Sequence, residues 1–143
     1  MLMGLRTFIV NAFAALGATT LGIATGVVWM VVTLYLRQPT PWFALPAGVL
    51  LAWVLRTGIH APGVVCAGLA VLATIVAVLS VNVLLAGVQL AGFMGLDLTD
   101  ALQTAGSGLL WQLARMATPP ADILWYGIGA ALAATIALRR TQR

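Results

Sequence analysis

The sequence predicts an all-α integral membrane protein with four transmembrane helices and one amphipathic interfacial helix on the outer face, between the third and fourth spans. Hydrophobic residues make up 62% of the 143 residues and charged residues only 7%, so a soluble fold could not cover its surface with polar groups. The uncharged runs are long enough to cross a bilayer, and the arginines lie near their ends. We therefore treat residues 1–143 as a single membrane domain.

The first two spans are separated by a proline-rich turn. The first is expected over residues 8–36, because the uncharged run after Arg6 is far longer than the apolar core of a signal peptide. Residues 37–41 then form a turn, since two prolines remove amide donors and disfavour helix in the residues before them. The second span, residues 43–59, is short, and Arg56 near its end can extend its guanidinium to the headgroups.

The third span is expected over residues 64–88, within a longer uncharged stretch. Continuous helix to Leu96 would exceed the thickness of the hydrocarbon core, and glycines near its end offer places to bend or stop. The sequence leaves open whether residues 89–97 remain helical. The last span, residues 122–138, follows two adjacent prolines and ends on a cluster of arginines.

Residues 98–117 have the pattern of an amphipathic helix. Asp97 is placed as its N-cap, with Asp100 complementing the helix dipole, and Gly106-Ser-Gly108 weakens its middle. A single apolar stripe beside polar residues is typical of a helix that lies on the membrane surface. The residues of this stripe recur at intervals of three and four: Leu98, Leu102, Ala105, Leu109, Leu113 and Met116.

The arginines predict the orientation. With both termini in the cytoplasm, five arginines lie inside, against Arg37 and Arg115 outside with the three aspartates, and the positive-inside rule favours this arrangement. Arginine without lysine, with an excess of alanine, favours a bacterium with a GC-rich genome, and hence the inner membrane. The five cytoplasmic arginines are expected to anchor the chain at lipid headgroups: Arg6, Arg56, Arg139, Arg140 and Arg143.

Two sets of residues are candidates for contacts within the membrane. Small residues at four-residue spacing let helices approach closely, and they occur in the first and last spans: Ala18, Gly22, Gly26, Gly129, Ala133 and Ala137. The third span carries Ser80, Asn82 and Gln89, which should face protein. These polar groups either bond to neighbouring helices, which is the commoner case, or line a wet path.

The chain has no motif for catalysis, a cofactor or a metal. Its one histidine, His60, lies in a turn without a nearby acid, and Cys66 is alone in an apolar run. Three aspartates, at positions 97, 100 and 122, could hold a hard cation, although capping of helix starts explains them with fewer assumptions. The scattered arginines do not form the basic face that nucleic acid requires.

We therefore expect a non-catalytic protein whose partners are membrane lipids and other membrane subunits, or copies of itself. The first hypothesis is an accessory, scaffold or binding subunit of a larger membrane complex. The alternative is a small homo-oligomeric transporter or channel with a polar path along the third span. The third hypothesis is an enzyme that acts on lipid.

Overall fold

The computed structural model describes residues 2–38, 40–58 and 63–139, and this part of the chain is helical with short connections. The predicted all-α class is confirmed at this level. The elements, in order, are α1 (Leu2–Leu36), the 3₁₀ turn η1 (Pro41–Phe43), α2 (Ala44–Gly58), α3 (Gly63–Met94), α4 (Leu98–Ala117) and α5 (Pro120–Leu138).

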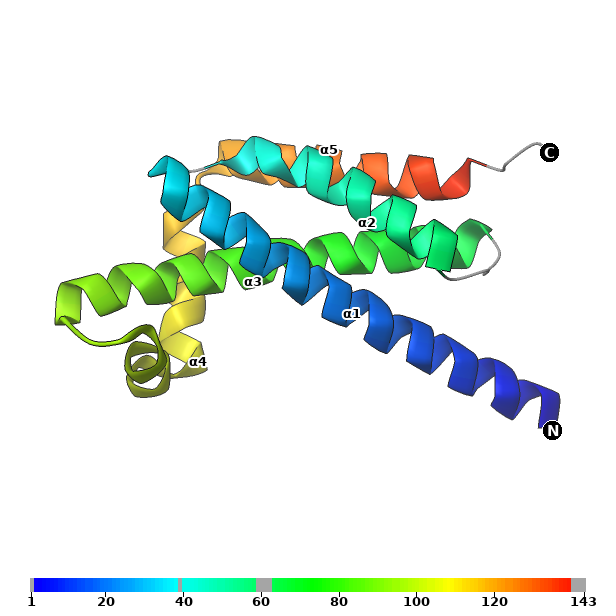
Figure 1. Cartoon of the computed structure of the whole chain (residues 1–143), viewed down its shortest axis with the longest axis horizontal. Coiled ribbons are helices and arrows are strands. Elements are labelled where there is room, and N and C mark those ends of the chain that lie inside the picture. Colours follow the sequence, from blue (N-terminus) through cyan, green and yellow to red (C-terminus); the bar gives the residue numbers. More distant parts are fainter. Residues whose placement is uncertain (1, 39, 59–62, 140–143) are drawn as a thin grey trace.

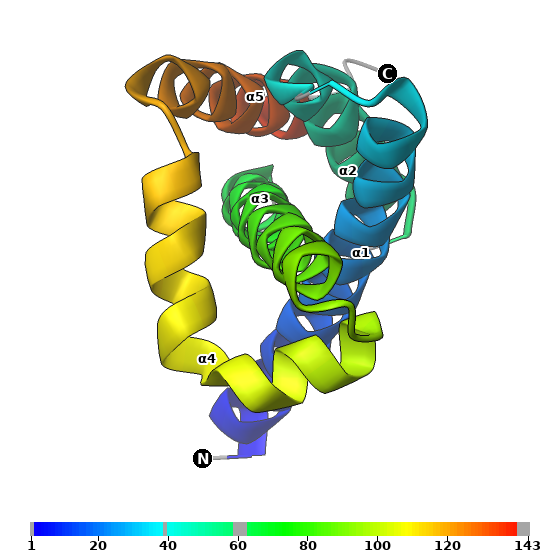
Figure 2. The same cartoon turned by 90° about the vertical axis from the view of Figure 1, so that its left-hand side faces the viewer.

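Four of the helices run roughly along one axis, and α4 runs across it (Figure 1). The start of α1, the end of α2, the start of α3 and the end of α5 lie on one side of the molecule. Seen along that axis, α3 is central, with α1, α2 and α5 around part of it and α4 completing the ring (Figure 2). The packed core is built mainly from alanines, because helices this close leave room for little else.

Helices α1 and α3 cross at the two glycines of α1. A Cβ placed on Gly22 would lie 2.6 Å from the carbonyl oxygen of Ala73, and one on Gly26 would lie 2.9 Å from that of Ala77. Both distances are shorter than van der Waals contact, so only glycine permits this approach. Ala18, which is fully buried, extends the same face by one turn.

Helices α2 and α5 meet in the same way. A Cβ on Gly48 would lie 2.6 Å from the carbonyl oxygen of Gly129, and a Cβ on Gly129 would lie 2.7 Å from that of Ala44. Ala133 and Ala137 are buried further along the same side of α5. The six small residues singled out in the sequence therefore all lie at positions buried between helices.

Helix α3 continues to Met94, so residues 89–94 are helical beyond the predicted end of the span. It ends where Gly95 adopts a left-handed backbone, with φ 64°. The amide of Leu96 then donates to the carbonyl of Ala91 at 3.1 Å, which is the bond that closes a Schellman motif. Glycine supplies this conformation without the steric cost of a side chain.

Helix α4 is two helical segments joined at Gly106, whose φ and ψ of 69° and 162° are not helical. The break changes the phase of the helix, so the six residues of the predicted stripe do not follow one continuous helix, and a single stripe is not confirmed. The buried residues of α4 are Ala101, Leu110 and Ala114, while Leu109 and Met116 of the predicted stripe are exposed. Asp97 occupies the predicted N-cap position, but its side chain makes no capping hydrogen bond there.

Three helical segments of the described chain are long and apolar enough to cross a membrane: Gly4–Leu36, Gly63–Met94 and Pro120–Leu138. They correspond to the first, third and fourth predicted spans. Helix α2 has 15 residues, fewer than the roughly 17–25 that a membrane-crossing helix needs. Length and composition thus support a multi-pass membrane protein with three spanning helices.

Candidate functional site

The residues after α1 fold back onto it and form a buried polar cluster. The indole N–H of Trp29 donates to the carbonyl oxygen of Thr40 at 3.1 Å and lies 3.2 Å from its hydroxyl. That hydroxyl also shares a hydrogen bond of 2.8 Å with Thr33. The indole packs against Phe43 of η1 and, edge to face, against Tyr126 of α5, with ring centroids 5.7 and 5.9 Å apart. This cluster fixes the C-terminal end of α1 against η1 and α5.

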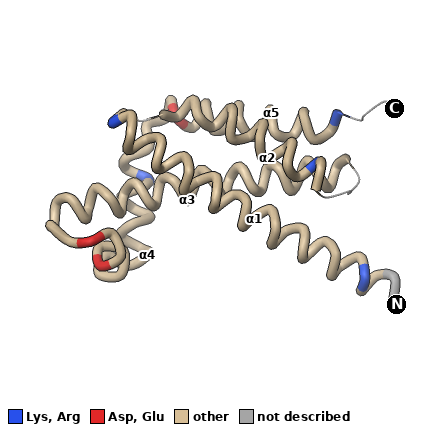
Figure 3. The backbone as a smooth tube through the Cα atoms, in the orientation of Figure 1, with Lys and Arg blue, Asp and Glu red and all other residues tan. Residues whose placement is uncertain are grey.

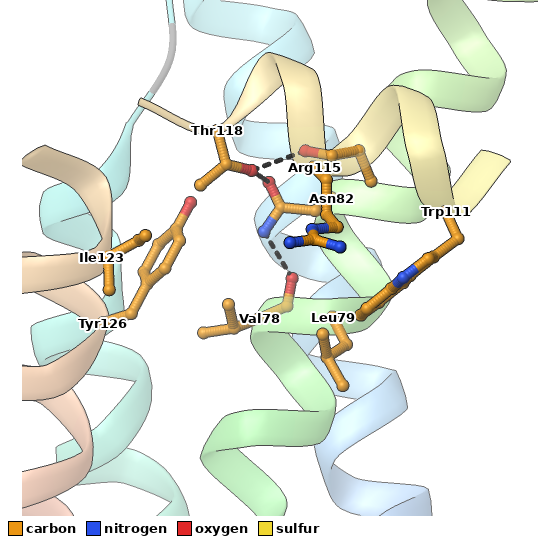
Figure 4. A pocket seen from close by; sticks show the side chains of 9 residues that line it. Val78, Leu79, Asn82, Trp111, Arg115, Thr118, Ile123 and Tyr126 are labelled. Atoms are coloured by element: carbon orange, nitrogen blue, oxygen red, sulfur yellow. Dashed lines mark hydrogen bonds between the residues drawn. The ribbon is translucent and has the colours of Figure 1, made fainter. Parts of the chain in front are cut away.

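Beside this cluster, a pocket of about 360 Å³ opens between α3, α4 and α5. Its volume falls within the range typical of small-molecule sites. Figure 4 shows Tyr126 and Ile123 of α5 on one side and Trp111 of α4 on the other, with Asn82 and the guanidinium of Arg115 between them. The remaining lining residues are Val78, Leu79, Ala114 and Thr118.

Hydrogen bonds hold the polar wall of the pocket in place. The amide of Asn82 donates to the carbonyl oxygen of Val78, 2.8 Å away on its own helix. The hydroxyl of Thr118 donates to the carbonyl oxygen of Ala114 at 2.7 Å and lies 3.4 Å from the side-chain oxygen of Asn82. The end of α4 therefore lies against the middle of α3, where the Thr118 hydroxyl is shared between the carbonyl oxygen of Ala114 and, at longer range, the side-chain oxygen of Asn82.

The pocket is rich in donors and poor in negative charge. Arg115 and Trp111 contribute N–H groups, and neither forms an ion pair or hydrogen bond within the described part of the chain. No carboxylate lines this pocket. Asp122 instead lines a smaller cavity of about 100 Å³, which shares Asn82 and Tyr126 with this pocket. The electrostatic character of the larger pocket is thus set by the guanidinium of Arg115.

The structure separates the three polar residues predicted for α3. Asn82 and Gln89 line the same smaller cavity, together with the threonines of the Trp29 cluster. Ser80 instead donates to the carbonyl oxygen of Val76 at 2.7 Å and its Cβ lies against Gly26 of α1. Two of the three side chains share one site, and the third belongs to a helix contact.

The charged residues divide between the two ends of the helix axis. Figure 3 shows arginines at the start of α1 and the ends of α2 and α5, and the acidic residues at the opposite end, around α4 and the start of α5. The first group comprises Arg6, Arg56 and Arg139. Arg140, Arg143 and His60 lie outside the described residues. Arg37 and Arg115 lie at the acidic end.

The carboxylate cluster considered from the sequence does not form a cation site. Among the described residues, no three His, Cys, Asp or Glu side chains are grouped closely enough to hold a metal ion. Asp100 lies in the first turn of α4 and Asp122 in the first turn of α5. Their negative charges interact favourably there with the positive ends of the helix dipoles.

Sequence reasoning missed most of the pocket. Among its lining residues, the sequence singles out Asn82 as a polar group of the third span and Arg115 as an arginine on the outer side, and nothing in it brings the two together with Trp111 and Tyr126. One signal was present: Arg115 follows Trp111 by four residues, so both lie on one face of α4. That spacing did not indicate which part of α3 they would face, because α4 is broken at Gly106.

The fold and composition define an all-helical chain with three helices able to cross a membrane. Comparisons with protein-family models, with curated proteins and with solved structures found no match. The function is therefore inferred from the geometry of the chain itself.

Proposed function

We propose that this chain is a non-catalytic subunit of a larger membrane assembly, acting there as an accessory, scaffold or binding protein. It would lie in a bacterial inner membrane with both termini in the cytoplasm. The four spans would be α1, η1 with α2, α3 and α5. Helix α4 would lie at the outer interface, in contact with lipid.

The arrangement of the helices supports this layout. Helix α4 runs across the axis that the other four share (Figure 1), as a helix in the membrane plane would. Arg6, Arg56 and Arg139 lie at the end that we assign to the cytoplasm, which agrees with the positive-inside rule. Residues 41–58, which form η1 and α2, could cross as a short span because Arg56 can extend to the headgroups.

The observation that carries the assembly role is the uncovered first third of α1. Every residue from Gly4 to Phe13 is exposed, and in Figure 1 this part of α1 diverges from the other helices. Asn11 lies seven residues before the buried Ala18, and thus on the same face of the helix. Its side-chain amide makes no hydrogen bond within the described part of the chain.

Lipid tails can cover exposed Phe8 and Phe13, but they cannot satisfy an amide. A polar side chain in the hydrocarbon region is stabilised when a neighbouring helix supplies its partner, and an unpaired one carries a desolvation cost. The face that α1 uses against α3 therefore continues past the point where the described part of the chain covers it. A helix of another subunit, seated in the angle between α1 and the bundle, would complete it.

Site-directed photo-crosslinking in native membranes tests this role. A photoreactive residue at Asn11 should yield a crosslinked adduct with a second polypeptide, whose mass identifies a copy of this chain or a different subunit. Thr20 is the matched control, because it is exposed on the opposite face of the same helix and should face lipid. Equal crosslinking at both positions, or none at either, would overturn the assembly role.

A second candidate is a homo-oligomeric transporter or channel, favoured by the shared cavity of Asn82 and Gln89. Flux of small polar solutes into liposomes carrying the purified protein tests it. Replacement of both residues by leucine should abolish the flux, while Ser80→Ala, which affects a helix contact, should not. Toward the opposite end, the core around α3 consists of alanines, leucines and Cys66, so a path through that half would have to run between subunits.

A further inference from the structure

We propose that the pocket between α3, α4 and α5 is a binding site for one anionic phospholipid of the outer leaflet. The phosphate group would lie against Arg115 and Trp111, and the acyl chains would leave the pocket past Leu79 and Ile123. This inference shares the membrane placement with the proposed function and is independent of the assembly role.

The charge and donor pattern of the pocket selects an anion. Arg115 has no ion-pair partner among the described residues, and a guanidinium presents several N–H donors in the planar geometry that suits a phosphate. Trp111 adds an indole N–H, which has no partner in the described chain. The amide of Asn82 donates to the carbonyl oxygen of Val78 and also lies within hydrogen-bonding range of the Tyr126 hydroxyl, so it contributes a donor already shared with the pocket wall.

The acceptors of the same wall are already engaged. The carbonyl oxygens of Val78 and Ala114 accept hydrogen bonds from Asn82 and Thr118, and the side-chain oxygen of Asn82 lies near the hydroxyl of Thr118. A ligand in this pocket therefore meets N–H groups, and no lining carboxylate repels a negative charge. A neutral or cationic headgroup would gain less from the same surroundings.

The apolar part of the pocket selects a lipid in place of a free anion. Val78, Leu79 and Ile123 form its walls, and Leu79 and Ile123 are 41% and 60% exposed, so the pocket is open on a side that would face acyl chains. An arginine and a tryptophan one helical turn apart are suited to the headgroup region, where one end of a ligand is charged and the other apolar. The pocket of about 360 Å³ would take the headgroup region, with the tails remaining in the bilayer.

Native mass spectrometry of the full chain tests the site. The protein is released from nanodiscs of equal parts phosphatidylglycerol and phosphatidylcholine, and the retained lipids are counted. The wild-type chain should retain one phosphatidylglycerol in preference to phosphatidylcholine. Arg115→Gln should reduce that retention about fivefold, which corresponds to roughly 1 kcal/mol for one arginine at an anionic surface.

Two further variants separate the pocket from general surface charge. Arg37→Gln removes an arginine at the same end of the molecule that does not line this pocket, and retention should stay within twofold of the wild type. Asn82→Leu keeps Arg115 but removes the amide donor, and it should also lower retention. Circular dichroism and gel filtration establish that each variant is folded.

The proposal is overturned if Arg37→Gln and Arg115→Gln lower retention equally, because the attraction would then be general to the surface. Retention of both lipids in the nanodisc proportion would also overturn it. So would displacement of phosphatidylglycerol by inorganic phosphate in the buffer, since the site would then take a free anion. Lipid retention without any crosslink at Asn11 would contradict the assembly role and leave the lipid site in place.

Discussion

Replacing Gly22 by alanine should destabilise the contact between α1 and α3. The added methyl would lie 2.6 Å from the backbone oxygen of Ala73 and 3.0 Å from the Cβ of Val76, so the helices must separate by about 1 Å to restore ordinary contact distances. The close atoms are a backbone oxygen and a Cβ, neither of which can rotate away. We expect a loss of about 1–3 kcal/mol, the usual cost of overpacking.

The measurement is reversible unfolding of the purified chain by sodium dodecyl sulfate in mixed micelles. Gly17→Ala is the matched control, because Gly17 lies on the same helix and a Cβ at this position would have no neighbour within 4 Å. The helix-propensity gain of about 1 kcal/mol for glycine to alanine in water should largely vanish in both variants, since α1 stays helical in the unfolded micellar state. The difference between the variants therefore reports the contact.

Equal stability of the two variants would refute this reasoning, since it would mean that α1 and α3 do not approach each other at Gly22. A stabilising effect of Gly22→Ala would refute it more strongly. Gly26→Ala provides an independent repeat, with its Cβ 2.9 Å from the carbonyl oxygen of Ala77. Its loss should be of the same sign.

The same unfolding assay checks three further expectations. Gly129→Ala should cost about 1–3 kcal/mol, because its methyl would lie 2.7 Å from a backbone oxygen of α2. Gly106→Ala should cost a similar amount, about 1–3 kcal/mol, because a backbone with φ 69° and ψ 162° suits glycine alone. Its control, Gly108→Ala, adds a methyl where there is open space and should change stability little. Thr40→Val should cost about 1 kcal/mol, because it removes the hydroxyl beside the Trp29 indole; an unchanged free energy of unfolding would contradict the role of that cluster.

Much of the fold follows from local sequence signals. Long apolar runs predict that α1, α3 and α5 are helices, because lipid requires every peptide group to bond within its helix. They do not predict every end: α1 begins before Arg6, and α3 continues to Met94. Small residues at four-residue spacing predict a close-packing face, but they do not predict which helix it meets. That Gly22 would meet Ala73, and Gly129 meet Ala44, depends on the three-dimensional path of the chain.

The candidate site could not be predicted from the sequence for a related reason. It joins residues from α3, α4 and α5, and its shape depends on the break at Gly106. The spacing of the apolar residues of α4 predicts one continuous helix over residues 98–117, with a single stripe toward the membrane surface. In the structure, Leu110 and Ala114 are buried in the segment after the break, and Trp111 and Arg115 of that segment line the pocket.

The crossing of α1 and α3 connects the core of this chain to its proposed role. Two long helices that touch at glycines must diverge on both sides of the contact. On the side of Trp29 the chain fills the gap itself, with η1 and the rings of Phe43 and Tyr126. On the side of Asn11 the described residues supply nothing comparable, and the exposed amide remains. Because the same geometry is completed at one end and open at the other, the open end is where we expect a second polypeptide to bind.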